Sequence, residues 1–244
     1  MPRIVVLGNS VALLARPPRD QRGPATYAEM LPGLLAGSGH GVDVVNVSER
    51  YLMIDGALED LERRVVSLSP DLVVINYGIV EAAPRLLPRP AYFYINRPFY
   101  RVSRLRRLVS GAAAAAERVL TPVMLGIAPG WRWLAPDLFR QCLRTAVEQL
   151  WKECRCAVVV LNIPRPSQRV ESLLPGIGRS VDRYNRVIND MGEMHNAHVL
   201  DVAAIAAGDP QRLSPDGVHF SVEGHREVAK AMAAVITERK LLES

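Results

Sequence analysis

The sequence of 244 residues has few cysteines and no long apolar run. Its three cysteines, Cys142, Cys154 and Cys156, form an odd, clustered set with no paired Cys/His pattern beside them. They favour reduced, structural thiols over a disulfide framework or a zinc site. Charges interrupt even the stretch GAAAAAERVL, so no segment reaches the length of a membrane span. We therefore expect no stable membrane insertion.

The beginning of the sequence lacks the features of a secretory signal. It passes from Met-Pro-Arg directly into a short strand-like run, without a charged region, a long apolar segment or a small-residue cleavage site. A cytoplasmic protein is therefore expected.

Acidic residues are absent between Glu81 and Glu117, although arginines are frequent there. The chain as a whole has 30 Lys and Arg against 25 Asp and Glu, a mild surplus that does not predict a nucleic-acid partner. The local basic stretch predicts either a solvated face or a helix against an acidic partner. The alternative is a basic flap that attracts an anionic substrate or a membrane surface.

Five short β-branched runs recur along the chain, and each is close to uniformly apolar instead of alternating. This pattern is typical of strands that are covered on both faces in a parallel sheet. The expected strands are Ile4–Leu7, Val42–Asn46, Leu72–Asn76, Ala157–Ile163 and Ala197–Val202.

Helical signals alternate with these runs. Asp55 and Asp137 are candidate caps of two amphipathic helices, and a last helix is expected after Ser221. Alternating strands and helices predict an α/β fold, in which right-handed crossovers build a three-layer α/β/α sandwich. At this length we expect one domain, residues 1–244.

The regular spacing is interrupted once, between Pro84 and Pro136. This segment is rich in Pro, Arg and aromatic residues and is much longer than a crossover requires. Because ligands of doubly wound folds bind outside the carboxyl ends of the strands, an insertion at that edge is placed to cover the site. We therefore interpret residues 84–136 as a helical or irregular insertion that forms a lid.

The run IVVLGNS, from Ile4 to Ser10, ends the first expected strand at a small polar turn. By the open-sheet rule, Ser10 is expected at the active edge of the sheet, where it is either a helix N-cap or a nucleophile. Near the other end, SPDGVHFSVEGH places Asp216 and His219 three residues apart on a loop. An imidazole that deprotonates a serine needs a carboxylate to fix its tautomer, and an Asp-x-x-His loop supplies both groups.

With these residues in view, the sequence resembles the SGNH or GDSL hydrolases. IVVLGNS is similar to the family's first block, with Asn9 where Asp is usual; LVVINYGIVEAAPR is similar to the third block and SPDGVHFSVEGH to the fifth. The resemblance implies a flavodoxin-like five-stranded parallel sheet and acyl transfer without a metal, usually ester hydrolysis. It implies Ser10 as nucleophile, His219 as base and Asp216 as the residue that orients the base.

The sequence departs from the family pattern where the oxyanion donors are expected. Gly78 is followed by Ile79 and Val80, where the family usually has an asparagine, and VVNVSERYL lacks the usual glycine. GIVEAAPR resembles a variant subgroup associated with cell-surface sugar or secondary-metabolite pathways. Losing one oxyanion donor typically costs on the order of 10²–10³ in rate.

Replacement donors must therefore come from other residues beside the Ser10 N–H. The candidates are the backbone of residues 48–51, the Asn76 amide and the Arg50 guanidinium, while the amide of Asn9 is an alternative way to hold the turn. Structural roles remain open for each of them. Asn76 is equally a buried structural amide, whereas for Arg50 the sequence favours a surface arginine.

Arg85 lies where the third expected strand meets the insertion. It either pairs with Glu81, four residues earlier, or holds a substrate carboxylate or phosphate in a bidentate manner. His225 is expected to pack or cap. No Walker A sequence, EF-hand, HExxH motif or dinucleotide-binding glycine pattern is present, so we expect neither a cofactor nor a metal.

Three functions are consistent with these features. The first is a serine-dependent esterase or deacylase whose substrate is an acyl ester of a small molecule or sugar; the basic insertion favours an anionic ester. The second is an O-acyltransferase, in which a lid that excludes water favours an alcohol acceptor. The third is a protein that binds without catalysis on the same fold. The sequence predicts no oligomeric state.

Overall fold

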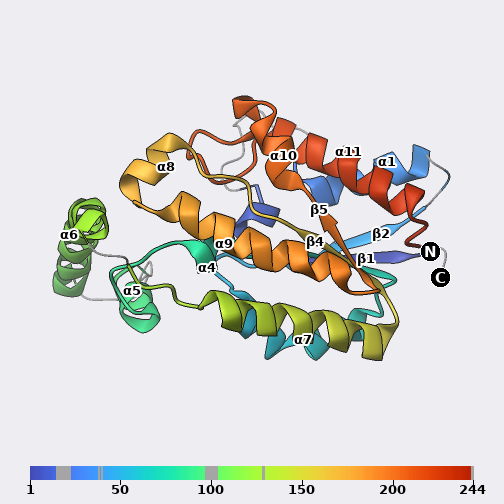
Figure 1. The fold of residues 1–244 in the computed structure, drawn as a ribbon, viewed down its shortest axis with the longest axis horizontal. Helices are drawn as coiled ribbons and strands as arrows, with labels where there is room; N and C mark the ends of the chain where they lie inside the picture. Colours follow the sequence, from blue (N-terminus) through green and yellow to red (C-terminus); the bar gives the residue numbers. More distant parts are fainter. Residues whose placement is uncertain (15–22, 38, 40, 97–103, 128–129, 243–244) are drawn as a thin grey trace.

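Five parallel strands form the central sheet of the computed structural model, which describes residues 1–14, 23–37, 39, 41–96, 104–127 and 130–242 (Figure 1). Their order is β2-β1-β3-β4-β5, which confirms the predicted flavodoxin-like parallel sheet. The strands are β1 (Arg3–Gly8), β2 (Asp43–Asn46), β3 (Leu72–Asn76), β4 (Ala157–Leu161) and β5 (Ala197–Leu200).

The order of strands reverses between β1 and β3, so the crevice at their carboxyl ends is the expected ligand site. β4 stops two residues before the predicted end at Ile163. The Asn162 N–H still donates to the Leu200 carbonyl of β5, whereas the next N–H, from Ile163, donates to the Asn185 side chain instead of to a strand.

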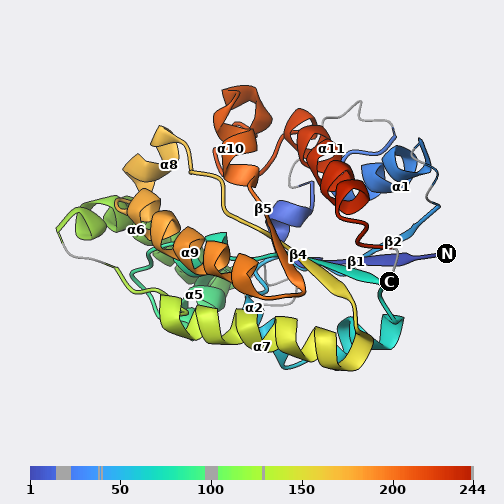
Figure 2. The same cartoon turned by 45° about the vertical axis from the view of Figure 1, so that its right-hand side comes forward.

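Helices cover both faces of the sheet, which confirms the predicted three-layer sandwich (Figures 1 and 2). The helices are α1 (Tyr27–Gly37), α2 (Ile54–Leu58), α3 (Leu61–Arg64), α4 (Ile79–Ala82), α5 (Arg89–Asn96), α6 (Arg104–Ile127), α7 (Pro136–Cys154), α8 (Gln168–Leu173), α9 (Ile177–Asn189), α10 (Val202–Ala207) and α11 (Val222–Glu238).

Alternate strand residues enter two separate apolar cores. Val5, Val73 and Val158 face α2, α3, α7 and α9, whereas their neighbours on the same strands face α1, α10 and α11. Each fully buried aliphatic side chain contributes roughly 1.5–3 kcal/mol relative to an exposed one. Burial on both faces explains why the strands read as continuous apolar runs.

Two helices begin at other residues than the sequence predicts. Asp55 lies inside α2, and the first N–H of that helix, from Ile54, is accepted by Glu81 instead. Asp137 lies in the first turn of α7, which begins with Pro136, a residue suited to this position by its fixed φ. Both predicted caps are therefore wrong. Ser221 does cap α11, because its hydroxyl accepts the N–H of Gly224 at 3.1 Å.

The predicted insertion contains α5 and α6, and its two ends meet. The backbones of Arg85 and Trp131 exchange two hydrogen bonds of 2.8 Å. Both views show α6 at the end of the molecule that lies away from the two termini (Figures 1 and 2). Residues 97–103 and 128–129 of the predicted insertion, with Arg97 and Arg101, lie outside the described residues.

Candidate active site

Ser10 stands at the turn where β1 ends. It is the first residue of a short 3-10 helix, Ser10–Ala12, whose cap is Asn9: the Asn9 Oδ1 accepts the Val11 N–H at 3.1 Å. The Asn9 N–H donates to the carbonyl of Asn76 at 3.3 Å. A Cβ on Gly8 would lie 2.8 Å from that same carbonyl, so β1 and β3 approach closely only because residue 8 is glycine.

Asp216 organises the loop before α11. Its Oδ1 accepts the backbone N–H groups of Val218 and His219 at 3.0 and 3.1 Å, and its Oδ2 lies 2.9 Å from His219 Nδ1. These hydrogen bonds outweigh partial burial and hold the pKa of the Asp216 carboxyl below its usual range. The carboxylate is therefore ionised near neutral pH.

The structure brings Ser10 and His219 together from opposite ends of the chain. The Ser10 Oγ lies 2.9 Å from His219 Nε2. An ionised Asp216 can only accept, so we assign the proton of the neutral imidazole to Nδ1. His219 Nε2 then accepts the hydrogen bond that the Ser10 hydroxyl donates. A hydroxyl, an imidazole and a carboxylate thus form one continuous row.

Asparagine side chains donate hydrogen bonds where the strands β2, β3 and β4 end. Asn46, which ends β2, donates to the carbonyl of Ala12 at 3.2 Å, and Asn162 follows β4 and donates to Asp201 at 2.7 Å. Asn76, which ends β3, donates to the hydroxyl of the buried Tyr27 at 3.2 Å. Its amide therefore has a structural partner, which is one of the two roles considered for it.

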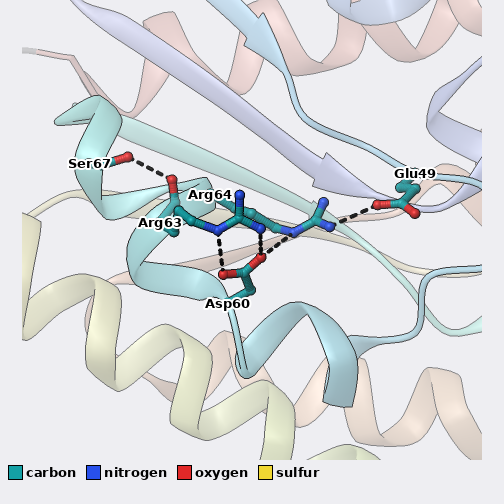
Figure 3. A network of polar contacts seen from close by, with 5 residues as sticks. All are labelled: Glu49, Asp60, Arg63, Arg64 and Ser67. Atoms are coloured by element: carbon teal, nitrogen blue, oxygen red, sulfur yellow. Dashed lines mark hydrogen bonds and ion pairs between the residues drawn. The ribbon is translucent and has the colours of Figure 1, made fainter.

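The loop of residues 48–51 begins beside β1 and is tied to α3. The Glu49 N–H donates to the Gly8 carbonyl at 3.0 Å. The Glu49 carboxylate accepts a hydrogen bond of 2.8 Å from Arg64, which also contacts Asp60 (Figure 3). Arg50 is exposed, as expected of a surface arginine, and Tyr51 adopts a left-handed conformation with φ of 62°. The network of Figure 3 ties Glu49 to α3, and the bond to Gly8 places Glu49 beside the end of β1, where Ser10 follows two residues later.

Glu81 joins two loops at the same edge of the sheet. Its carboxylate is fully buried and accepts the N–H of Ile54 at 3.0 Å and that of Gly78 at 2.9 Å. Burial raises the pKa of Glu81 to about 7, although both N–H donors act in the opposite direction. Gly78 has φ of 125°, and a Cβ there would lie 2.5 Å from Ile163, so this position requires glycine.

Arg85 makes contacts that differ from the predicted ion pair. Its guanidinium carbon lies 4.8 Å from the ring centres of both Tyr92 and Trp133. The expected pair with Glu81 is wrong, because that carboxylate is occupied by backbone N–H groups. Arg85 therefore joins the start of the insertion to its end. An anion-binding role for Arg85 stays a prediction.

His225 lies behind the site in the apolar core. It is completely buried, its Nδ1 accepts the Tyr27 N–H at 3.3 Å, and burial lowers its pKa to about 4. This is the packing role that was expected. Within the described ranges, no group of three or more His, Cys, Asp or Glu side chains is placed to hold a metal ion.

The fold and this row of side chains define a serine hydrolase that acts on esters. A model of the GDSL-like lipase/acylhydrolase family matches residues 6–227, and the chain belongs to this family. This match confirms the resemblance to the SGNH or GDSL hydrolases that the three sequence blocks indicated. Comparison with curated proteins gives no match.

Solved structures share the fold over nearly the whole chain. A lipase/acylhydrolase from Enterococcus faecalis is 19% identical with a TM-score of 0.66, and the match covers 98% of this chain and 97% of that one. An acetylxylan esterase from Geobacillus stearothermophilus is 19% identical with a TM-score of 0.61, and the match covers 95% and 92%.

Sequence reasoning missed two groups that hold the site in place. Glu81 was considered only as a partner of Arg85, although it is the one acid within the apolar run that follows β3. Asn46 was considered only as a strand end. The signal is an acid in an otherwise apolar run for Glu81 and an amide at a strand end for Asn46, because backbone groups released after a strand need partners.

Proposed function

We propose that the protein hydrolyses an acyl ester through an acyl-enzyme formed on Ser10, with His219 as general base and Asp216 as the residue that orients it. The observation that carries this proposal is the continuous row of two 2.9 Å contacts, from Ser10 Oγ to His219 Nε2 and from His219 Nδ1 to Asp216 Oδ2. Membership of the GDSL-like lipase/acylhydrolase family supports the same chemistry.

Acylation begins when the Ser10 oxygen attacks the ester carbonyl and His219 Nε2 takes its proton. The resulting imidazolium is stabilised by the ionised Asp216. His219 then gives the proton to the leaving alkoxide, which departs as an alcohol. In the second half, His219 deprotonates a water molecule, which attacks the acyl group and releases the acid and free Ser10.

Oxyanion stabilisation is assigned first to the backbone N–H of Ser10. N–H groups in the first turn of a helix have no partner within that helix, and Ser10 opens the 3-10 turn. A second donor would come from the 48–51 loop, which Glu49 fixes against Gly8 and Arg64. Asn76 is a weaker candidate because its amide already donates to Tyr27.

The proposed substrate is an acyl ester of a small molecule or sugar. One similar structure is an acetylxylan esterase, which supports a sugar ester as the first class to assay. Arg50 is exposed on the loop next to the site, and this favours a substrate with negative charge near the ester.

The decisive experiment is labelling with a fluorophosphonate, read by intact mass and peptide mapping. We expect one adduct, on Ser10, that is lost in Ser10→Ala and strongly slowed in His219→Ala. The exposed serine variant Ser172→Ala is the matched control. An unlabelled wild-type protein, or label on another residue, would overturn the proposed nucleophile.

Product analysis distinguishes hydrolysis from transfer. Both share the acyl-enzyme, and they differ only in whether water or an alcohol attacks it. Turnover of a short acyl ester with and without an added acceptor alcohol is expected to yield free acid in both cases. An acylated acceptor as the main product would instead identify the O-acyltransferase.

A further inference from the structure

Large apolar side chains are exposed mainly at one end of the molecule. The last nine residues of α6 carry five of them, each between 45% and 77% exposed. Trp131, just beyond the helix, is 73% exposed. We call this surface the α6 apolar face, and it comprises Val119, Leu120, Val123, Met124, Ile127 and Trp131.

The helical residues of this face form two adjoining rows. Val119, Val123 and Ile127 follow one another at intervals of four, and Leu120 and Met124 lie beside them. At 3.6 residues per turn, they span an arc of roughly 140°. Thr121 and Leu125, on the opposite side of the helix, are buried. α6 is thus seated on its inner side, and its outer side is apolar.

The chain that leads into this face is basic. Between Glu81 and Glu117 the sequence contains no Asp or Glu and seven arginines. Three of these, Arg104, Arg106 and Arg107, fall in the first turn of α6. α6 thus begins with arginines and ends with an apolar stripe, and this combination is typical of helices that lie in the interface of an anionic membrane.

The α6 apolar face is on the same side of the molecule as Ser10. The strands run toward the end at which α6 lies, away from both termini (Figures 1 and 2). α6 packs against α8, and Ser167, the cap of α8, donates its N–H to the Gly217 carbonyl at 3.0 Å. α8 thus joins the face to the loop that bears Asp216 and His219.

We propose that the α6 apolar face docks the protein onto the surface of an anionic lipid membrane. The apolar side chains enter the interface, while the arginines contact lipid phosphates. Within the described residues no helix is long and apolar enough to cross a membrane, so the mode is peripheral. Delivery of a membrane-borne acyl ester to Ser10 rests on the proposed function, but docking itself does not.

A second copy of the chain fits this surface less well. It would cover the apolar side chains, but residues 82–116 of the second copy bring seven further arginines and no carboxylate to complement them. Anionic lipid headgroups complement both parts of the surface. The basic stretch and the apolar stripe therefore favour the same occupant.

Sedimentation with vesicles tests the proposal. The full chain is expected to bind vesicles of phosphatidylglycerol and phosphatidylcholine and to bind pure phosphatidylcholine much less. Replacing Arg104, Arg106 and Arg107 by Gln should weaken binding roughly 100-fold, at about 1 kcal/mol per charge. The double variant Val123→Ser, Ile127→Ser should weaken it roughly tenfold or more.

Two controls isolate the face. Replacing Arg63, Arg144 and Arg226, which are exposed elsewhere, by Gln removes the same charge and should leave vesicle binding within about twofold. Brominated lipid should quench tryptophan emission in the wild type, and Trp131→Phe should remove most of this quenching.

Ser10→Ala should bind vesicles normally while lacking turnover, which separates docking from catalysis.

Three results would overturn the proposal. The first is equal binding to anionic and neutral vesicles, or none to either. The second is equal weakening by the control and α6 arginine variants. The third is a stable dimer in light scattering that Val123→Ser, Ile127→Ser dissociates, since that outcome would assign the face to a second copy.

Discussion

Asp216 holds His219 with both of its carboxylate oxygens. Oδ2 contacts the imidazole Nδ1 at 2.9 Å, and Oδ1 accepts the backbone N–H of His219 at 3.1 Å. One side chain thus fixes the position of His219 in the chain, its ring orientation and its tautomer. The geometry before α11 therefore depends on a contact that spans only three residues.

Replacing Asp216 by Asn should separate these tasks. The amide oxygen can still accept the backbone N–H groups, so the loop is expected to fold. The amide N–H₂ faces Nδ1, however, and favours the tautomer that carries its proton on Nε2. We expect kcat for a short acyl ester to fall on the order of 10³–10⁴-fold with little change in Tm. A variant that keeps a tenth of wild-type kcat would contradict the role of Asp216.

Gly217→Ala should disrupt the same loop. Gly217 has φ of 75°, and a Cβ there would lie 1.9 Å from the Ser167 hydroxyl oxygen. We expect a loss of turnover of at least tenfold together with a clear loss of stability in urea. Gly176→Ala is the matched control: its φ is 85°, but the nearest atom to a new Cβ is 3.7 Å away. It should cost only the left-handed strain, about 1–2 kcal/mol. Equal effects of the two substitutions would contradict the steric argument.

Glu81→Gln should change how stability depends on pH. The pKa of Glu81 is about 7 in the folded protein, above its ordinary 4.5, so the folded state binds the proton more tightly. The stabilisation that comes from this tighter proton binding is fully present below pH 4.5 and is lost as the pH rises through 7. For a wholly buried group this loss amounts to about 3 kcal/mol.

Urea titrations between pH 5 and 8 measure this effect. The free energy of unfolding of Glu81→Gln, relative to wild type, should rise across that window, because Gln does not titrate. Glu62→Gln, at an exposed position of α3, is the control and should run parallel to wild type. Parallel curves for Glu81→Gln as well would show that Glu81 does not titrate as its burial requires.

Asn9→Ala should loosen the turn that bears Ser10. The substitution removes the acceptor of the Val11 N–H, which is buried, at a cost of about 1–3 kcal/mol. We expect slower fluorophosphonate labelling of Ser10 and a lower Tm. Asn9→Asp keeps an oxygen in the capping position and should label within about threefold of wild type. Labelling of Asn9→Ala at the wild-type rate would show that the cap does not position the serine.

Local patterns predicted the strands well because burial on both faces leaves a direct imprint on the sequence. All five apolar runs became strands, and Ser221 became a cap. Asp55 and Asp137 failed as caps because competing partners were available: Glu81 reaches Ile54 across the fold, and Pro136 starts α7 without a capping side chain. Only the second of these partners is visible locally.

The sequence by itself determined the kind of sheet, the short contact between Asp216 and His219, and the family. These features depend on apolar continuity, on a spacing of three residues, and on blocks of residues that can be compared. The tertiary structure decided the rest. The 2.9 Å contact between Ser10 and His219 closes 209 residues of chain, and the burial of Glu81 and the stacking of Arg85 depend on elements far apart in sequence. Such contacts arise only when the sheet brings the carboxyl ends of its strands to one edge, so no local pattern could determine them.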